Sequence, residues 1–111
     1  NLPEDLKRVC ENDAVLIDAL GGYVAQHLDS ENDTWERQTE ALLSQISFMK
    51  QTCVVVIEET GWGVVPSTAI GGLFRDRLGA LAQRLDRQAV ASWLVVQGRA
   101  LDLHALGVPV P

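Results

Sequence analysis

Three short runs of the chain are almost continuously apolar, and they predict buried β-strands. The runs are Ala14–Leu20, Cys53–Glu58 and Ser92–Gly98. Polar and apolar residues do not alternate along them, as they would in a strand with one face in water. We therefore expect strands that are covered on both faces, as in a parallel sheet.

The two long segments between these runs have the spacing of amphipathic helices. The first begins at Asp33-Thr34-Trp35-Glu36, where an acidic cap is followed by a glutamate three residues later. Its apolar stripe consists of Trp35, Leu42, Leu43, Ile46 and Met49. The second helix is expected from about Thr68 to Ala89, with a buried stripe of Ile70, Leu73, Phe74, Leu78, Leu81 and Leu85. The residues that fall off this stripe are Arg75, Asp76, Gln83, Arg84 and Arg87.

The alternation of strand and helix predicts the α/β class, with a mostly parallel, doubly wound sheet and flanking helices. We expect residues 1–111 to form one domain, with a helix turn or two at Pro3–Val9 and an irregular, Pro-rich tail at Gly107–Pro111. Ligands of such sheets bind beyond the carboxyl ends of the strands. The positions to inspect are Asp18 with Gly21-Gly22, Glu58-Glu59, and Gln97-Gly98-Arg99.

Composition narrows the class of protein further. The longest apolar runs are too short to span a bilayer and the N-terminus has no signal pattern, so we expect a cytoplasmic protein without a membrane partner. A net charge of −6 argues against binding to a nucleic-acid backbone. Cys10 and Cys53 lack the spacing of a zinc site or a disulfide framework, which favours two idle thiols.

Charge is divided unevenly along the chain. Residues 1–59 hold twelve acidic and four basic side chains, whereas residues 60–111 hold three acidic side chains and five basic ones, all arginine. Arginine can recognise phosphate or carboxylate through its planar fork. It can equally be solvated helix surface, which is the more common case for any single arginine.

The segment Glu58–Pro66 is the densest candidate for chemistry. A buried strand delivers two carboxylates into a loop in which Gly61 and Gly63 flank a tryptophan. One interpretation is a plain strand-to-helix turn, with glycines for backbone freedom and Pro66 near the helix start. The other is a loop shaped around a ligand, and the residues alone leave both open.

Val54–Gly98 resembles the C-terminal region of the bifunctional adenosylcobinamide kinase / adenosylcobinamide-phosphate guanylyltransferase family of cobalamin biosynthesis. That family has Asn-Glu-Val-Gly-x-Gly-Ile-Val-Pro, then Phe-Arg-Asp-x-x-Gly-x-x-Asn-Gln on a helix, then an apolar strand ending in glycine. The matching residues here are Glu59, Gly61, Gly63, Val65, Pro66, Phe74, Arg75, Asp76, Gly79, Gln83, Trp93–Val96 and Gly98. Upstream, Val15–Leu20 is similar to the family's strand that ends in an acidic residue, so the likeness extends from about Ala14 to Leu103.

The resemblance implies a P-loop or recombinase-like fold, here without the N-terminal P-loop strand. It implies phosphorylation of adenosylcobinamide and guanylyl transfer to adenosylcobinamide phosphate, with GTP or ATP and Mg²⁺ as cofactors, in a homo-oligomer. By the same resemblance Asp18 is a metal ligand. The residues expected to bind the nucleotide are Asp18, Glu59, Gly61, Gly63, Arg75, Asp76 and Gln83.

The departures from the family concern the reacting groups. No Gly-x-x-x-x-Gly-Lys-Ser/Thr is present, and neither Lys7 nor Lys50 follows suitable glycines. His27 and His104 do not match the family histidine that accepts the guanylyl group, so no catalytic residue is assigned.

Three further positions differ from the family: Glu58 and Ala82 replace asparagines, and Gly21 replaces a hydroxyl residue. Two interpretations follow. The chain is either the C-terminal portion of a longer enzyme, inactive alone, or a short noncatalytic paralogue that acts as an interaction domain. We favour the first, because a sheet without its P-loop strand would expose an edge.

Overall fold

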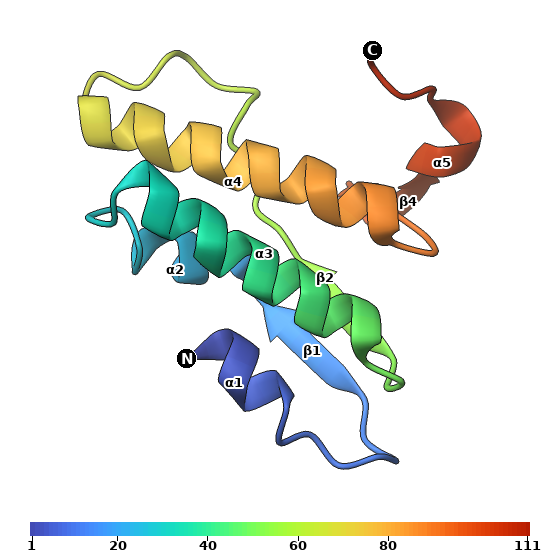
Figure 1. The fold of residues 1–111 in the computed structure, drawn as a ribbon. Coiled ribbons are helices and arrows are strands. Elements are labelled where there is room, and N and C mark those ends of the chain that lie inside the picture. The colour runs from blue at the N-terminus through green and yellow to red at the C-terminus, as the bar shows by residue number, and fades with distance from the viewer.

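The computed structural model describes residues 1–111 as helices packed on one small sheet, with a separate hairpin towards the C-terminus (Figure 1). In chain order the elements are α1 (Leu2–Leu6), β1 (Val15–Asp18), α2 (Leu20–Ala25), α3 (Asn32–Phe48), β2 (Cys53–Val56), α4 (Ala69–Gln88), β3 (Trp93–Val96), β4 (Arg99–Asp102) and α5 (Leu103–Leu106). The α/β class expected from the sequence is confirmed, although the sheet is small. No helix is both long enough and apolar enough to cross a membrane.

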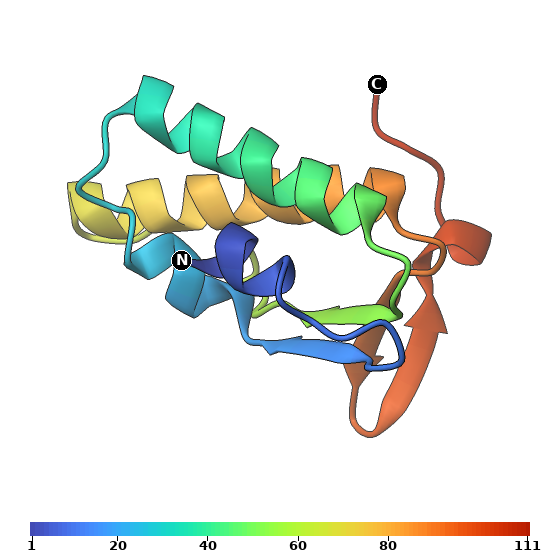
Figure 2. The same cartoon turned by 60° about the horizontal axis from the view of Figure 1, so that its bottom comes forward.

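Strands β1 and β2 form a parallel pair in which Val15 lies opposite Cys53 and Asp18 opposite Val56. Figure 2 shows α3 and α4 together on one face of this pair. On the opposite face, Leu16 is 64% exposed and Val54 is 53% exposed. The strands are therefore covered by this chain on one face only, although their apolar sequences predict cover on both.

The core lies between the helices and the inner face of the sheet. Its most deeply buried side chains are Leu20, Val24, Leu42, Leu78 and Leu81. The stripe predicted for α3 is confirmed, with Trp35, Leu42 and Leu43 buried. In the stripe predicted for α4, Leu78, Leu81 and Leu85 are buried and Leu73 and Phe74 are half-buried. Ile70 is 59% exposed because it lies in the first turn, ahead of the part of α4 that packs on the core.

The third predicted strand does not join the parallel sheet, and that prediction is wrong. β3 pairs antiparallel with β4, a strand that the sequence analysis missed, with Val96 opposite Arg99. The two residues between them have positive φ angles, 53° at Gln97 and 70° at Gly98, which is the backbone of a tight two-residue hairpin turn. Gln97-Gly98-Arg99 is therefore a hairpin turn and not part of the carboxyl edge of the parallel sheet.

Side chains cap the first turns of α1, α4 and α5, whereas α3 begins at Asn32 without a side-chain cap, so the acidic cap predicted at Asp33 is wrong. Asn1 caps α1 by accepting from the backbone N–H of Glu4, and Thr68 caps α4 by accepting from the N–H of Gly71. The single turn of α5 is capped by Asp102. Beyond it, Gly107–Pro111 has no regular structure, as its prolines predict.

Candidate functional site

The carboxyl ends of β1 and β2 lie side by side because the two strands are parallel and in register. Asp18 is the last residue of β1, its side chain is exposed, and it makes no hydrogen bond within the chain. Glu58 and Glu59 leave the end of β2 two and three residues after Val56, the register partner of Asp18. The edge at which ligands of parallel sheets bind is thus lined with carboxylates.

A hydrogen bond joins the two strand ends. The backbone N–H of Gly21, in the first turn of α2, donates to Glu58 Oε1 at 2.9 Å. The cap position of α2 is Ala19, whose side chain has no acceptor. Glu58, 37 residues away in sequence, therefore supplies the acceptor that the first turn of α2 lacks.

The loop after β2 has a second carboxylate contact. Gly61 donates its N–H to Glu59 Oε1 at 2.6 Å, so this side chain folds back on its own loop. Gly63 has nothing within 4 Å of the position that a Cβ would take. The side chains of Trp62, Val64 and Val65 are exposed. Backbone is thus accessible along the loop, as an approaching ligand would require.

The remaining predicted residues lie on α4. Arg75 donates from Nε and Nη2 to Asp76 Oδ1, at 3.2 and 3.1 Å, and its Nη1 has no partner in the chain. Gln83 is exposed and makes no side-chain hydrogen bond. No hydrogen bond connects these three residues to Asp18 or to the loop. Among the seven residues predicted to bind the nucleotide, the structure joins Glu59 to Gly61 and Arg75 to Asp76.

Arg77 was not singled out from the sequence, where arginines are read mainly as solvated surface, and that interpretation is wrong for this residue. It is 5% exposed and donates to His27 O and Ser30 O, each at 2.8 Å. Its guanidinium also lies 5.2 Å from the ring centre of Trp35. The signal was present, because Arg77 falls between Phe74 and Leu81 on the buried side of α4.

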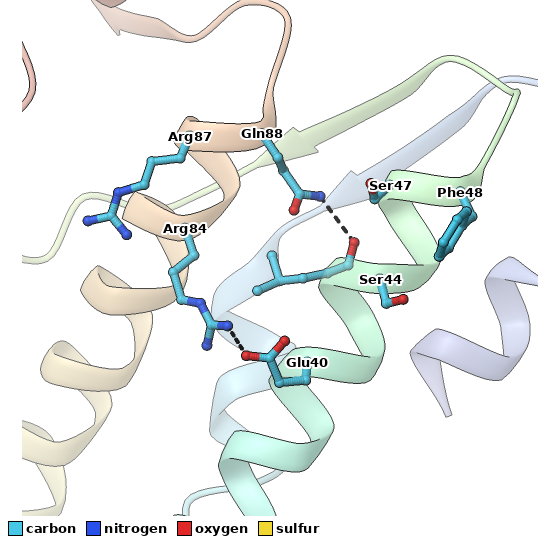
Figure 3. Close-up of a pocket in the computed structure, with 8 residues that line it drawn as sticks. Glu40, Ser44, Ser47, Phe48, Arg84, Arg87 and Gln88 are labelled. Carbon is cyan, nitrogen blue, oxygen red and sulfur yellow. Dashed lines mark hydrogen bonds and ion pairs between the residues drawn. The ribbon is translucent and has the colours of Figure 1, made fainter.

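A groove of about 400 Å³ lies between the C-terminal halves of α3 and α4 (Figure 3). Arg84 crosses it to Glu40 and also contacts Glu36 at 3.4 Å. Gln88 donates to the carbonyl of Leu43 at 3.2 Å. None of the residues predicted to bind the nucleotide lines this groove, and its polar side chains tie the two helices together.

The two histidines have structural partners. His27 Nδ1 lies 2.8 Å from the carbonyl oxygen of Tyr23, and His104 Nε2 lies 3.0 Å from Asp86 Oδ1.

Burial raises the pKa of the Tyr23 hydroxyl and of the Cys53 thiol. A raised thiol pKa leaves little thiolate, so Cys53 is a poor nucleophile.

The carboxylates at the strand ends meet part of what Mg²⁺ requires. This ion typically takes one or two protein carboxylates and completes its shell with water and phosphate oxygens. The chain has no group of three or more His, Cys, Asp or Glu side chains placed to enclose a metal. A single exposed carboxylate at a strand end, as at Asp18, fits an ion that arrives with its phosphates.

Comparison with known proteins gave one family. The family model described as cobinamide kinase / cobinamide phosphate guanyltransferase matches residues 1–103. The bifunctional adenosylcobalamin biosynthesis protein CobU of Escherichia coli strain K12 is 31% identical over 101 residues, which cover 78% of this chain and 56% of that protein. The protein of the same name from Salmonella typhimurium strain LT2 is 32% identical, with the same coverage. The chain spans about half the length of these curated relatives.

Proposed function

Because the chain belongs to the cobinamide kinase / cobinamide phosphate guanyltransferase family, we propose that it provides the acidic side of a nucleotide site that acts in cobalamin biosynthesis. The family match confirms the resemblance found in the sequence around Gly61–Asp76. The observation that carries the proposal is the position of Asp18, a free carboxylate at the carboxyl end of a parallel strand.

Asp18 is the residue proposed to face the metal–nucleotide complex. Its carboxylate is exposed and has no partner to displace, so it can accept a metal ion or its water without loss of a contact. When bound, Mg²⁺ would neutralise charge on the phosphates of GTP or ATP. Asp18 would hold that complex at the sheet edge and orient it.

The loop after β2 and the start of α4 are proposed to bind the rest of the nucleotide. The contact between Glu59 and Gly61 supports a local turn at the start of the loop, and the open position at Gly63 allows close approach of a ligand to the backbone. Asp76 holds two nitrogens of Arg75, and the free Nη1 is available to an anionic oxygen. Gln83 stays a prediction from the resemblance.

Two groups that the proposed reactions need are not among these 111 residues. There is no Gly-x-x-x-x-Gly-Lys-Ser/Thr to hold a triphosphate, and both histidines are engaged in structural contacts. We propose that another polypeptide segment supplies the phosphate loop and the guanylyl-accepting histidine. Adenosylcobinamide, its phosphate and self-association are likewise proposed by family membership.

A chimera tests this division of roles. Residues 1–103 replace the matching region of the E. coli relative, and guanylyl transfer from radiolabelled GTP to adenosylcobinamide phosphate is measured with Mg²⁺. We expect transfer by the chimera and no covalent label on the 111-residue chain alone. A folded but inactive chimera, or strong labelling of the chain alone, would refute the proposal.

The open face of the sheet supports a second candidate function. Leu16, Val54 and Val56 expose apolar side chains on neighbouring strands, which suits an interaction domain that binds a partner polypeptide there. Val54→Glu would block such a partner with little effect on the core, since Val54 faces away from the helices. Transfer activity in the chimera separates the candidates, because a noncatalytic paralogue would not support it.

A further inference from the structure

The absence of a side chain at residue 21 has a specific structural reason. A Cβ built on Gly21 would lie 2.3 Å from Glu58 Oε2 and 2.7 Å from Glu58 Cδ. The backbone of Gly21 does not itself require glycine, since Gly98 is the only glycine with a positive φ angle. The next residue, Gly22, has nothing within 4 Å of its Cβ position.

We propose that Gly21 and Glu58 form a coupled pair that fixes the turn between β1 and α2, and that Glu58 is thereby a positioning residue for Asp18. Gly21 leaves the space that the carboxylate occupies, and the carboxylate then accepts the N–H that Ala19 leaves uncapped. The coupling rests on the geometry of the fold alone. Only its consequence for chemistry at Asp18 rests on the proposed function.

The hydrogen bond between Gly21 and Glu58 connects the segments that follow β1 and β2. From Asp18 the chain passes through Ala19 and Leu20 to Gly21, and the hydrogen bond then leads to Glu58, which follows the register partner of Asp18 by two residues. Leu20 is fully buried and anchors the same turn in the core. The turn that follows Asp18 is thus held on both sides, by the buried Leu20 and by the hydrogen bond to Glu58.

A side chain at residue 21 would displace the carboxylate instead of breaking the fold. Glu58 is a flexible, exposed side chain that can move away from a new methyl group. What it would lose is the hydrogen bond to the N–H of residue 21, and with it the favourable placement of a negative charge at a helix N-terminus. The expected defect is therefore local, and the two residues should not act independently.

Amide hydrogen exchange in the free chain tests the pair without any ligand. In Glu58→Ala we expect the amide of residue 21 to exchange on the order of tenfold faster, with the core amides of α3 and α4 unchanged. Glu58→Gln keeps an acceptor of the same length and should restore most of the protection. Gly21→Ala should lose it as Glu58→Ala does, whereas Gly22→Ala, the matched control one residue on, should retain it.

The carboxyl ¹³C shift of Asp18 reports on positioning in the same variants. We expect it to move in Glu58→Ala and in Gly21→Ala, and to stay near its original value in Glu58→Gln and Gly22→Ala. The double variant Gly21→Ala/Glu58→Ala should lie no further from the original protein than either single variant, with melting temperatures within about 4 °C of Glu58→Ala. Additive effects of the two single changes, or an Asp18 signal that ignores Glu58, would overturn the proposal.

Discussion

Arg77 places a guanidinium in the core without a carboxylate to balance it. Its charge is met by carbonyl dipoles of the segment after α2, at His27 and Ser30, by the side chain of Asn32 at 3.2 Å, and by the face of Trp35. This one side chain therefore joins α4 to the loop that leads from α2 into α3. Removal would leave the Ser30 carbonyl without its donor and the His27 carbonyl with only the N–H of Ser30, and a polar group that loses its partner inside a fold is costly.

We predict that Arg77→Ala lowers the free energy of unfolding by about 2–4 kcal/mol, because two charge-assisted hydrogen bonds and the contact with Trp35 are lost together. Arg77→Lys should lose less, since it keeps the charge but cannot reach both carbonyls with one fork. Urea unfolding measures both effects. Arg87→Ala, an exposed change on the same helix, should stay within about 0.5 kcal/mol, and an equal loss there would contradict the assigned role.

Asp86 makes the stability of the fold depend on pH in the acid range. A hydrogen bond from Ser92 is the main cause that lowers the pKa of Asp86 below its ordinary 3.8, and His104 adds to it. A lowered pKa in the folded state means that the ionised carboxylate stabilises the fold above pH 3.8, and that this contribution disappears as the pH falls through the lowered value. We predict that the difference in melting temperature between the protein and Asp86→Asn is present at pH 5 and shrinks as the pH falls below about 4. A difference independent of pH would contradict this.

Single residues were predictable where one pattern decided their environment. The stripe of α3 and most of the stripe of α4 followed from helical spacing, because packing on one face explains them fully. The exposure of Ile70 was not predictable in this way, and for Arg77 the spacing indicates the buried side of α4 but not the groups that its cation contacts. Where the core ends along a helix, and which cation receives carbonyl partners, depend on how other segments lie against that helix.

At the scale of elements, the hairpin of β3 and β4 is the clearest departure from expectation. The run Trp93–Val96 is as apolar as a central strand, yet Trp93 and Val95 are 55% and 68% exposed. The sequence predicts Gln97-Gly98 as the end of a parallel strand near a ligand, although the same two residues also suit a tight turn. A two-residue turn with positive φ angles decided the pairing locally, whereas the long-range register that would place this strand in the sheet has no local signal.

We predict that Gly98→Ala weakens the hairpin by about 1 kcal/mol, because an alanine at a φ of 70° is strained. Gln97→Asn should strengthen it by a few tenths of a kcal/mol, since asparagine tolerates this backbone. Amide exchange across β3 and β4 measures both. Gly79→Ala on α4, where a Cβ meets nothing within 4 Å, is the matched control and should stabilise the helix. Equal behaviour of the two alanine variants would show that the turn does not limit the hairpin.

The pairing of the parallel sheet was predictable from the sequence, but the contact between its two strand ends was not. Parallel pairing of β1 and β2 and the placing of Asp18 and Glu58 at one edge followed from strand and helix order. The hydrogen bond from Gly21 to Glu58 did not, because a contact across 37 residues between a backbone group and a flexible carboxylate leaves no spacing in the sequence. The sequence marks this contact only through two differences from the family, since Gly21 replaces a hydroxyl residue and Glu58 replaces an asparagine.

For the whole molecule, charge and family membership support one arrangement. The acidic first half brings Asp18, Glu58 and Glu59 to the carboxyl edge, where a metal ion with its phosphates would be attracted. The second half contributes Arg75, the cation nearest in sequence to the loop, which pairs with Asp76 and leaves Nη1 free. The sequence could predict this division, because it is a property of order along the chain. The joint geometry of the seven proposed residues was not predictable, because they lie on β1, on the loop after β2 and on α4, which are far apart in the sequence.

The most direct test of a nucleotide site at Asp18 is the rate of guanylyl transfer by the chimera. The rate of its Asp18→Asn variant is compared with the rate of its Asp13→Asn variant. Asp13 is an exposed acid two residues before the start of β1, away from the strand end that carries Asp18, so its change controls for the loss of one negative charge. We predict that Asp18→Asn lowers the rate by roughly a hundredfold at saturating Mg²⁺, with an unchanged melting temperature, and that Asp13→Asn has less than about a twofold effect. An Asp18→Asn chimera that turns over at the original rate would contradict the assignment of the nucleotide site to this edge.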